Sequence, residues 1–235
     1  MAPEQTIFQR ARRPEHKQQR YDAILTAARA LALQNSVRDV SLADIAAEVG
    51  MHKSALLRYF TTRDEIYLHL AAQDWQAWAE AMACALADAP TGSTTAVAAA
   101  FTRTLADRPL LCDLLAHVPL NLERNVPIGS ARAYKLTVLA AADRLLTQVH
   151  QVLPDLADAD LWDLLAAVTS AAAGLHQVVH PPPTLAALYR EDPQLGHANV
   201  DFAASLHRIT DVILLGFQHR HAQRGLSRRV DPEQV

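Results

Sequence analysis

Several residue types are scarce in this chain of 235 residues, and each scarcity argues against a particular kind of site or structure. It has two cysteines, Cys84 and Cys112, without CxxC spacing, which gives little support to a disulfide framework or a thiolate zinc site. Glycines number only seven, which argues against a phosphate-cradling loop. No apolar run reaches the ~20 residues that span a bilayer, and the first residues lack the apolar core of a secretory signal. We therefore expect a cytoplasmic protein with no membrane partner.

Aromatic residues make up 6% of the chain, whereas half of all residues are apolar and alanine and leucine dominate. Alanine and straight-chain residues lose the least on entering a helix. The length is sufficient for a sizeable core, in one helical domain or in a small domain joined to a larger one. The composition predicts an all-α protein, and nothing in the sequence indicates a cofactor.

Positive charge gathers near the N-terminus although the formal net charge is −3. Residues 1–70 carry ten lysines and arginines against eight acidic residues, and residues 71–235 carry twelve against seventeen. Five basic residues cluster before the first regular helical spacing of apolar residues: Arg10, Arg12, Arg13, Lys17 and Arg20. The cluster indicates an arm, residues 1–14, that meets phosphates or a minor groove; a solvated basic tail is the alternative.

Capping residues and apolar spacing predict three helices in the first 60 residues. The first covers residues 15–34. Ser41 is suited to cap the second, with Asp44 adding a carboxylate to the positive end of the helix dipole. Gly50 ends this helix, because glycine tolerates the left-handed conformation that stops a helix sharply. The third then covers residues 51–60.

Later helices follow from the same signals. Thr62 and Glu65 form a capping box at the start of a fourth helix that stops before residue 90. Apolar spacing predicts the others at 94–107, 109–117, 128–153, 159–179 and 200–219. Pro119 and Pro127 bracket a stretch that is expected to be irregular, residues 120–125. Three prolines at 181–183 end a helix, about fifteen residues after them are expected to form a polar connection, and the residues after His221 are expected to be unstructured.

The most informative segment is residues 41–60, where two short helices meet at a glycine turn. Apolar side chains of both helices face inward, and Ala46 must be small because the helices cross there. The second helix turns a polar set outward: His52, Lys53, Ser54, Arg58 and Tyr59. A helix with such a surface can enter the major groove of DNA.

This segment resembles the N-terminal signature of the TetR (tetracycline-repressor-like) family of transcriptional regulators. Ile45-Ala46, Gly50, Phe60 and residues 62–65 fit the signature in register. The departures are Ser41 for the usual Thr, Met51 for Val, His52 for Ser, Ser54 for Gly, Leu57 for Tyr and Arg63 for Lys. Leu57 lacks a hydroxyl that reaches the DNA backbone in the family, and Tyr59 is suited to replace it.

The resemblance implies a helix-turn-helix DNA-binding domain at residues 15–62, a ligand-binding and dimerisation domain at 63–221 and a flexible tail at 222–235. It further implies a homodimer that binds a palindromic operator in double-stranded DNA and is released by a small molecule, with repression the commoner mode. The implied DNA contacts are Lys53 and Arg58 to phosphates or guanine edges, His52 and Ser54 to base edges, and Ser41, Tyr59 and Arg63 to phosphates.

The resemblance also implies an effector cavity, for which an apolar or aromatic compound is favoured. The polar and aromatic candidates to line it are Trp75, Trp78, Met82, Cys112, His117, Asn121, Arg124, Trp162 and His176. Ordinary core or surface placement is the alternative for each of them.

Dimerisation is expected through the helices at 159–179 and 200–219, since both carry more apolar surface than one subunit can cover. The residues assigned to this contact are Leu164, Val168, Leu175, Leu206, Ile213 and Phe217.

Three other classes of protein are a metal sensor, a helical enzyme and a purely structural helical dimer, in which the positively charged N-terminal segment and the outward His52, Lys53 and Arg58 would have no purpose. The pairs His176 with His180 and His207 with Asp211 have the spacing of metal ligands, but neither pair has a third ligand nearby in sequence, and no metal site is predicted. A helical enzyme that processes small molecules is the alternative to a regulator. The sequence has neither GxSxG nor HExxH, so no catalytic residue is predicted.

Overall fold

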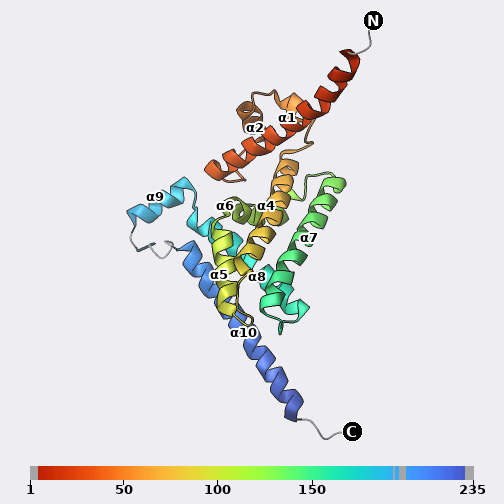
Figure 1. Cartoon of the computed structure of the whole chain (residues 1–235). Coiled ribbons are helices and arrows are strands. Elements are labelled where there is room, and N and C mark those ends of the chain that lie inside the picture. The colour runs from red at the N-terminus through yellow and green to blue at the C-terminus, as the bar shows by residue number, and fades with distance from the viewer. Residues whose placement is uncertain (1–4, 193, 196–199, 231–235) are drawn as a thin grey trace. The chain divides into compact units, whose positions relative to one another are not determined.

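A computed structural model describes the backbone of residues 5–192, 194–195 and 200–230, and every long element within these ranges is helical (Figure 1). The elements are α1 (Gln5–Asn35), α2 (Leu42–Glu48), α3 (Lys53–Leu56), α4 (Arg63–Leu86), α5 (Thr94–Ala106), α6 (Pro109–His117), the π-helix η1 (Val118–Leu122), α7 (Ile128–Val152), α8 (Asp158–Val179), α9 (Pro183–Glu191) and α10 (Phe202–Val230). The expected all-α fold is confirmed.

The chain divides into two compact units. Unit 1 consists of Met1–Ala71 and His117–Tyr134, and unit 2 of Ala72–Ala116 and Lys135–Val235. Helices α4 and α7 each begin in unit 1 and end in unit 2. The first unit therefore includes a second stretch of chain, which runs from the end of α6 through η1 and ends in α7, in addition to the N-terminal helices.

The helices at the two ends of the chain are longer than their sequence patterns predict. Helix α1 begins at Gln5, so most of the predicted arm has helical backbone, while residues 1–4 lie outside the described residues. Helix α10 continues to Val230 through most of the predicted tail, and residues 231–235 are likewise outside the described part. Apolar periodicity marks where the burial of a helix ends and not where the helix itself ends, so it does not reveal these extensions.

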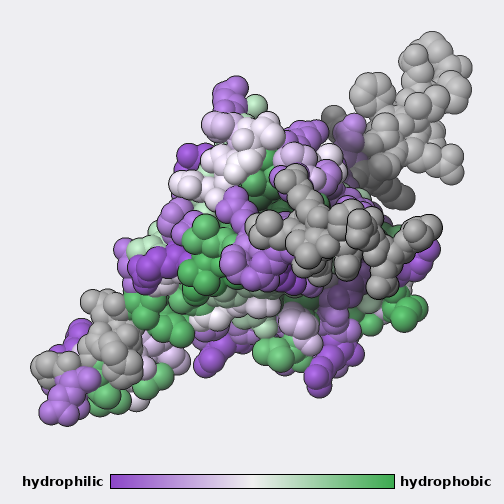
Figure 2. Space-filling view, turned by 90° about the horizontal axis from the view of Figure 1, so that it is seen from below, coloured by the Kyte–Doolittle hydropathy of each residue, from purple (hydrophilic) through white to green (hydrophobic). Residues whose placement is uncertain are grey.

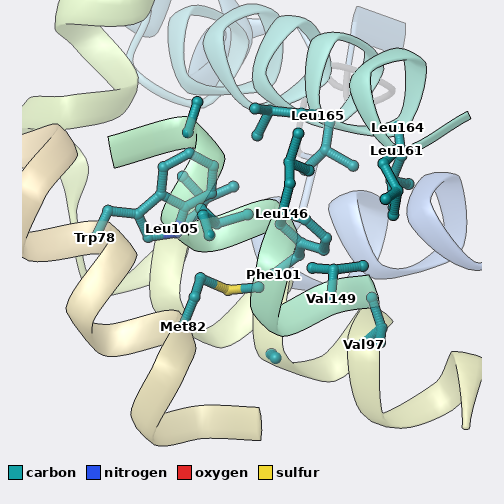
Figure 3. Close-up of a cluster of buried hydrophobic side chains, with 14 of the residues drawn as sticks. Trp78, Met82, Val97, Phe101, Leu105, Leu146, Val149, Leu161, Leu164 and Leu165 are labelled. Carbon is teal, nitrogen blue, oxygen red and sulfur yellow. The ribbon is translucent and has the colours of Figure 1, made fainter. Parts of the chain in front are cut away.

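The core of unit 2 is built from apolar faces of α4, α5, α6, α7, α8 and α10, part of which is drawn in Figure 3. Helix α10 packs along α5 and α8. Trp78 of α4 and Phe101 of α5 are fully buried, with ring centroids 6.1 Å apart. Leu146 of α7 and Leu164 of α8 are buried in the same cluster. Burial of such side chains contributes about 1.5–3 kcal/mol each, which makes this cluster the main source of stability in unit 2.

The hydroxyl of Thr104 is the hydrogen-bond acceptor for the buried indole N–H of Trp78 inside this apolar core. The indole Nε1 of Trp78 donates to Thr104 Oγ1 at 2.9 Å, and that hydroxyl donates to the carbonyl of Ala100 at 2.7 Å. The Sδ of Met82 lies 3.2 Å from the same oxygen. Thr104 is 4% exposed, so a solvent molecule has little access to replace it.

A buried carboxylate links the start of α8 to the far part of α10. Asp160 is 6% exposed; its Oδ1 accepts from Arg220 at 2.5 Å and its Oδ2 lies 2.8 Å from Nε2 of His221. The Arg220 guanidinium also lies over the Phe217 ring, 4.7 Å from its centroid. These contacts bring polar residues beyond the apolar pattern of α10 into contact with α8.

Two stretches that were predicted to be irregular are helical in part. The π-helix η1 covers the first residues of the stretch 120–125. Helix α9 lies within the stretch predicted to be a polar connection, and none of its nine residues is buried. The described ranges contain no helix that is long and apolar enough to cross a membrane.

The Thr104 hydroxyl leads to a stability prediction. Thr104→Val keeps the shape of the side chain but leaves the buried Trp78 N–H without its acceptor, so the free energy of unfolding should fall by about 1–3 kcal/mol in urea titrations. Thr169→Val is the matched control, because Thr169 makes only an α-helical bond to the carbonyl of Leu165 four residues earlier and a weaker one to Ala166. It should change stability by less than about 0.5 kcal/mol. Equal losses in the two variants would contradict a special role for Thr104.

Candidate functional site

A reciprocal capping box starts α2. The backbone N of Asp44 donates to Ser41 Oγ at 3.2 Å, and the backbone N of Ser41 donates to Asp44 Oδ2 at 2.8 Å. The Ser41 hydroxyl also donates to Asp44 Oδ2 at 2.7 Å. These bonds from Ser41 lower the pKa of Asp44. The predicted cap is thus present, and the Ser41 hydroxyl donates its proton to Asp44.

The turn after α2 depends on Gly50, whose φ is +63°. Backbone bonds close this turn: Gly50 N donates to the carbonyl of Ala47 at 3.0 Å, and Met51 N donates to that of Ala46 at 2.8 Å. No heavy atom lies within 4 Å of where a Cβ would stand on Gly50. The position therefore requires glycine for its dihedral angle and not for space.

The segment after the turn has an inner and an outer face. Leu56 and Phe60 are buried, at 0% and 1% exposure, together with Ile45 and Ala46 of α2. The α-helix covers only Lys53–Leu56, and the chain continues to Phe60 in turns closed by bonds such as Arg58 N to the carbonyl of Ala55. The predicted outward residues do lie outward: His52, Lys53, Ser54 and Arg58 are exposed, and Tyr59 is partly exposed.

These outward residues form the recognition surface, which we define as His52, Lys53, Ser54, Arg58 and Tyr59. His52 Nδ1 lies 3.2 Å from Ser54 Oγ, so the two side chains predicted to reach base edges are held together. Leu57, which replaces a tyrosine of the family pattern, is 43% exposed beside them. Two cations and several hydrogen-bonding groups on one exposed surface are what contacts to phosphates and base edges require.

Arg63 is engaged within unit 1. Its Nε donates to the carbonyl of Val40 at 2.5 Å, Nη2 donates to the carbonyl of Val37, and Nη1 pairs with Asp64 at 2.9 Å. Its guanidinium carbon lies 4.8 Å from the centroid of the Tyr67 ring. Arg63 therefore ties the start of α4 to the loop before α2, a role that its neighbours in sequence do not reveal.

Three rings from distant segments meet behind the recognition surface. Tyr21 of α1 stacks on Phe60 with centroids 4.7 Å apart, and His69 of α4 meets both rings edge-on, at 5.8 and 5.6 Å. Burial lowers the pKa of His69, and Glu65 opposes this only in part. Burial, with contributions from Glu65 and Asp22, raises the pKa of Tyr21. Both effects keep this cluster uncharged, which suits its place against apolar residues.

Glu65 joins the start of α4 to the second stretch of unit 1. Its Oε2 accepts from the backbone N and the hydroxyl of Thr61, at 2.6 and 2.5 Å, and its Oε1 accepts from Ser130 Oγ of α7 at 2.6 Å. Of the predicted capping box, the Thr62 half is present, since Glu65 N donates to Thr62 Oγ1 at 3.1 Å, whereas the carboxylate of Glu65 accepts from the backbone N of Thr61. Burial raises the pKa of Glu65, but the bonds from Ser130 and Thr61 outweigh it and hold the pKa below its usual value.

The predicted effector residues do not line one cavity. Trp75, Trp78 and Met82 are buried in the core of unit 2, whereas Trp162 is 41% exposed on α8. Three others belong to unit 1, where one is buried and two are exposed: His117, Asn121 and Arg124. Cys112 and His176 border one pocket together.

That pocket lies in unit 2 and has a volume of about 360 Å³. We call it the α6–α10 pocket; its lining residues are Leu105, Ala106, Pro109, Cys112, His176, His180, Asp201, Phe202 and Ala203. Burial raises the pKa of the Cys112 thiol to about 12, so the sulfur stays protonated at neutral pH, and it lies 3.5 Å from the carbonyl of Leu105. The described residues include no group of three histidine, cysteine or acidic side chains that could hold a metal ion.

The residues predicted for dimerisation lie inside unit 2. Leu164, Val168 and Leu206 are 0% exposed, and Phe217 is 7% exposed. Leu175 and Ile213 are partly buried against the same core. The same two helices present other apolar side chains to solvent: Trp162 and Val178 on α8, and Ile209, Val212 and Leu215 on α10. Hydrophobic residues are visible at the surface among hydrophilic ones in Figure 2.

A capped helix, a glycine turn and a short second helix with an exposed cationic surface define a helix-turn-helix DNA-binding protein. Comparison with known families agrees. The family described as "Bacterial regulatory proteins, tetR family" matches residues 24–70, and "Tetracyclin repressor-like, C-terminal domain" matches residues 72–221. The chain belongs to the TetR family of DNA-binding transcriptional regulators, which are transcription factors and not enzymes.

Solved structures show the same fold at low sequence identity. The regulator PfmR from Thermus thermophilus is 15% identical with a TM-score of 0.52, covering 81% of this chain and 96% of its own. FadR from Bacillus halodurans is 11% identical with a TM-score of 0.53, covering 83% and 97%. Thermus thermophilus FadR, solved in complex with lauroyl-CoA, is 16% identical with a TM-score of 0.53, covering 83% and 93%. A search of curated proteins finds no match.

The Glu65 contacts give a prediction with a defined pH dependence. The folded pKa lies below the unfolded one, so the stabilisation is present above the unfolded value of about 4.3 and is lost as pH falls through the folded value. Glu65→Gln should therefore lower the free energy of unfolding at pH 7, and its deficit relative to wild type should narrow below pH ~4. Urea titrations at a series of pH values measure this gap.

Glu80→Gln is the control, because Glu80 is exposed on the same helix. It should leave stability nearly unchanged at every pH. A Glu65→Gln deficit that is the same at pH 3 and pH 7 would show that the charge of Glu65 is not what stabilises the fold.

Proposed function

We propose that this protein is a repressor that binds a palindromic operator in double-stranded DNA as a homodimer and is released by a small-molecule effector. The observation that carries the proposal is the recognition surface, where Lys53 and Arg58 are exposed on a segment whose inner face is fully buried. Burial of Leu56 and Phe60 holds the segment rigidly enough to present those cations in fixed positions.

The contacts to DNA divide by chemistry. Lys53 and Arg58 reach phosphates or guanine edges, and the linked pair His52 and Ser54 reaches base edges. Tyr59 contributes a phosphate contact two positions after Leu57, which has no hydroxyl. Ser41 and Arg63 are secondary candidates, because both already bond within unit 1; a phosphate has to compete with those bonds or use the remaining donors.

Dimerisation is proposed through the exposed sides of α8 and α10. Val212 is 68% exposed and Leu215 is 50% exposed, and Trp162 of α8 is 41% exposed. Large apolar side chains that remain in solvent on two packed helices favour a second copy as their cover. A two-fold dimer presents its recognition surfaces about one DNA turn apart, ~34 Å, which is why we expect a palindrome.

Release requires an effector that binds the DNA-free state better than the DNA-bound state. The complex of Thermus thermophilus FadR with lauroyl-CoA supports the idea that a helical unit of this fold takes such a compound. At 16% identity that likeness extends to the fold alone, so the class of effector has to be argued from the pocket of this chain.

The DNA-binding proposal predicts the result of selection from random duplexes. The wild-type protein should enrich a palindrome, and Lys53→Ala and Arg58→Ala should each weaken binding to it by about 1–3 kcal/mol, or roughly 5- to 150-fold. Gel shifts at two salt concentrations measure both affinity and salt dependence. Loss of a phosphate contact lowers the salt slope by about one, whereas loss of a base contact relaxes the selected sequence.

Arg144→Ala is the control for charge alone, since Arg144 is exposed on α7 in unit 2. It should bind the selected duplex like the wild type. Absence of any enriched sequence at low salt, or an enriched site without symmetry, would count against the proposal.

The dimer proposal predicts that Val212→Asp separates the subunits, because a carboxylate would have to be buried in an apolar contact. Sedimentation velocity at micromolar concentration should give a dimer for the wild type and a monomer for the variant. Leu136→Asp is the matched control, as Leu136 is 50% exposed on α7 outside the proposed contact, and it should remain dimeric. A monomeric wild type would refute the assignment.

A further inference from the structure

The α6–α10 pocket is formed where four helices end or begin. Leu105 and Ala106 are the last residues of α5, and Pro109 is the first of α6. His176 and His180 stand at the end of α8, and Asp201 precedes α10. All of these residues belong to unit 2, and none takes part in the proposed DNA contacts.

Two imidazoles provide hydrogen-bonding groups at one side of the pocket. The rings of His176 and His180 have centroids 4.2 Å apart and are inclined by 33°. His180 Nδ1 lies 3.0 Å from the carbonyl oxygen of His176, which can only accept, so Nδ1 carries a proton. When the ring is neutral and Nδ1 carries its proton, Nε2 of His180 is a hydrogen-bond acceptor. A ligand that binds there therefore needs a hydrogen-bond donor.

The charges around the pocket favour a cation. Among the described residues that line it, none is a lysine or an arginine, and Asp201 alone carries a carboxylate. The ends of α5 and α8 bring the negative ends of two helix dipoles, and the starts of α6 and α10 bring two positive ends, so the dipoles offset one another and the carboxylate of Asp201 is the charge that decides. Arg108 stands next to Pro109, but its guanidinium donates to the carbonyls of Thr104 and Ala77 and borders a different groove.

The start of α10 is the place where an anion could otherwise bind. The N–H groups at a helix start attract negative charge. Here the backbone N of Ala204 already donates to Asp201 Oδ1 at 2.8 Å, and Ser205 N donates to the carbonyl of Asp201 at 3.0 Å. The protein thus supplies its own carboxylate at this helix start, so a carboxylate or phosphate ester would meet repulsion there.

The rest of the lining is apolar and the space is small. Leu105, Pro109 and Phe202 contribute apolar surface, and the Cys112 thiol remains uncharged. A volume of about 360 Å³ lies near the lower end of the ~300–1,000 Å³ range of small-molecule pockets, which suits a compound of one or two rings. Aromatic rings can stack on Phe202 or on the imidazoles.

We propose that the α6–α10 pocket binds a compact aromatic amine: its ring lies among Phe202, Leu105 and the histidines, and its ammonium group donates to His180 and Asp201. The inference deepens the proposed function, on which it rests, by naming the class of effector. It excludes anionic compounds as the preferred ligands, because the described lining offers no cation to pair with them.

Three probes carry the same indole ring system and differ in the charge of the side chain: tryptamine is a cation, tryptophol is neutral and indole-3-propionate is an anion. Comparing their affinities tests the effect of ligand charge at nearly constant shape. Calorimetric titration of the full-length protein at low salt should show the tightest binding for tryptamine, weaker binding for tryptophol and the weakest for indole-3-propionate. Asp201→Asn should weaken tryptamine binding about fivefold and leave tryptophol unchanged, since asparagine still caps a helix but has no charge. Asp211→Asn, on the same helix outside the pocket, is the control.

A second pair of variants tests the location. Ala106→Trp fills the pocket from an exposed position at the end of α5 and should abolish binding of all three probes, whereas Ala99→Trp, exposed on the same helix away from the pocket, should not. The assignment is overturned if tryptamine gives no heat at millimolar concentration, if indole-3-propionate binds as tightly as tryptamine, or if Ala106→Trp still binds. The selection of DNA sequences described above uses no probe, so it tests the proposed DNA binding independently of whether the pocket binds tryptamine.

Discussion

The left-handed backbone at Gly50 is the constraint on which the DNA-binding part of the chain depends. Its φ of +63° ends α2 and starts the next segment at an angle that buries Leu56 and leaves Lys53 and Arg58 in solvent. Any residue with a Cβ would strain this turn even though open space surrounds it. The buried face of the recognition segment then maintains the geometry, and Arg63 holds the loop before α2 against the start of α4.

Signals carried by a few neighbouring residues predicted the structure well. The box of Ser41 and Asp44, the turn at Gly50 and the exposure of Lys53 and Arg58 all follow from local rules and agree with the structure. Predictions that needed a distant partner did worse. Leu164 and Phe217 lie on apolar faces as expected, but periodicity does not say whether a helix of the same chain or a second subunit covers such a face; here α5, α8 and α10 cover one another.

The contacts of Arg63 and the bond between Glu65 and Ser130 lay beyond sequence reasoning for the same reason. Their partners are carbonyls of residues 37 and 40 and the hydroxyl of Ser130, which only the folded chain brings near. The α6–α10 pocket is a similar case, since its lining comes from the ends of four helices. Cys112 and His176 were predicted to line an effector cavity because of their residue types, and His180 was singled out only for its metal-ligand spacing from His176. No local signal in the sequence indicated that Asp201 and Phe202 line the pocket.

The two cysteines have a practical consequence. Cys112 is buried with a pKa of about 12, so it is a poor nucleophile, whereas Cys84 is exposed near the end of α4. A maleimide dye or a nitroxide label will therefore attach to Cys84 in the unmodified protein. If two subunits pair symmetrically, each carries one label on α4, and spectroscopy can measure the distance between the two labels. Movement of α4 in solution can then be followed without any substitution in the sequence.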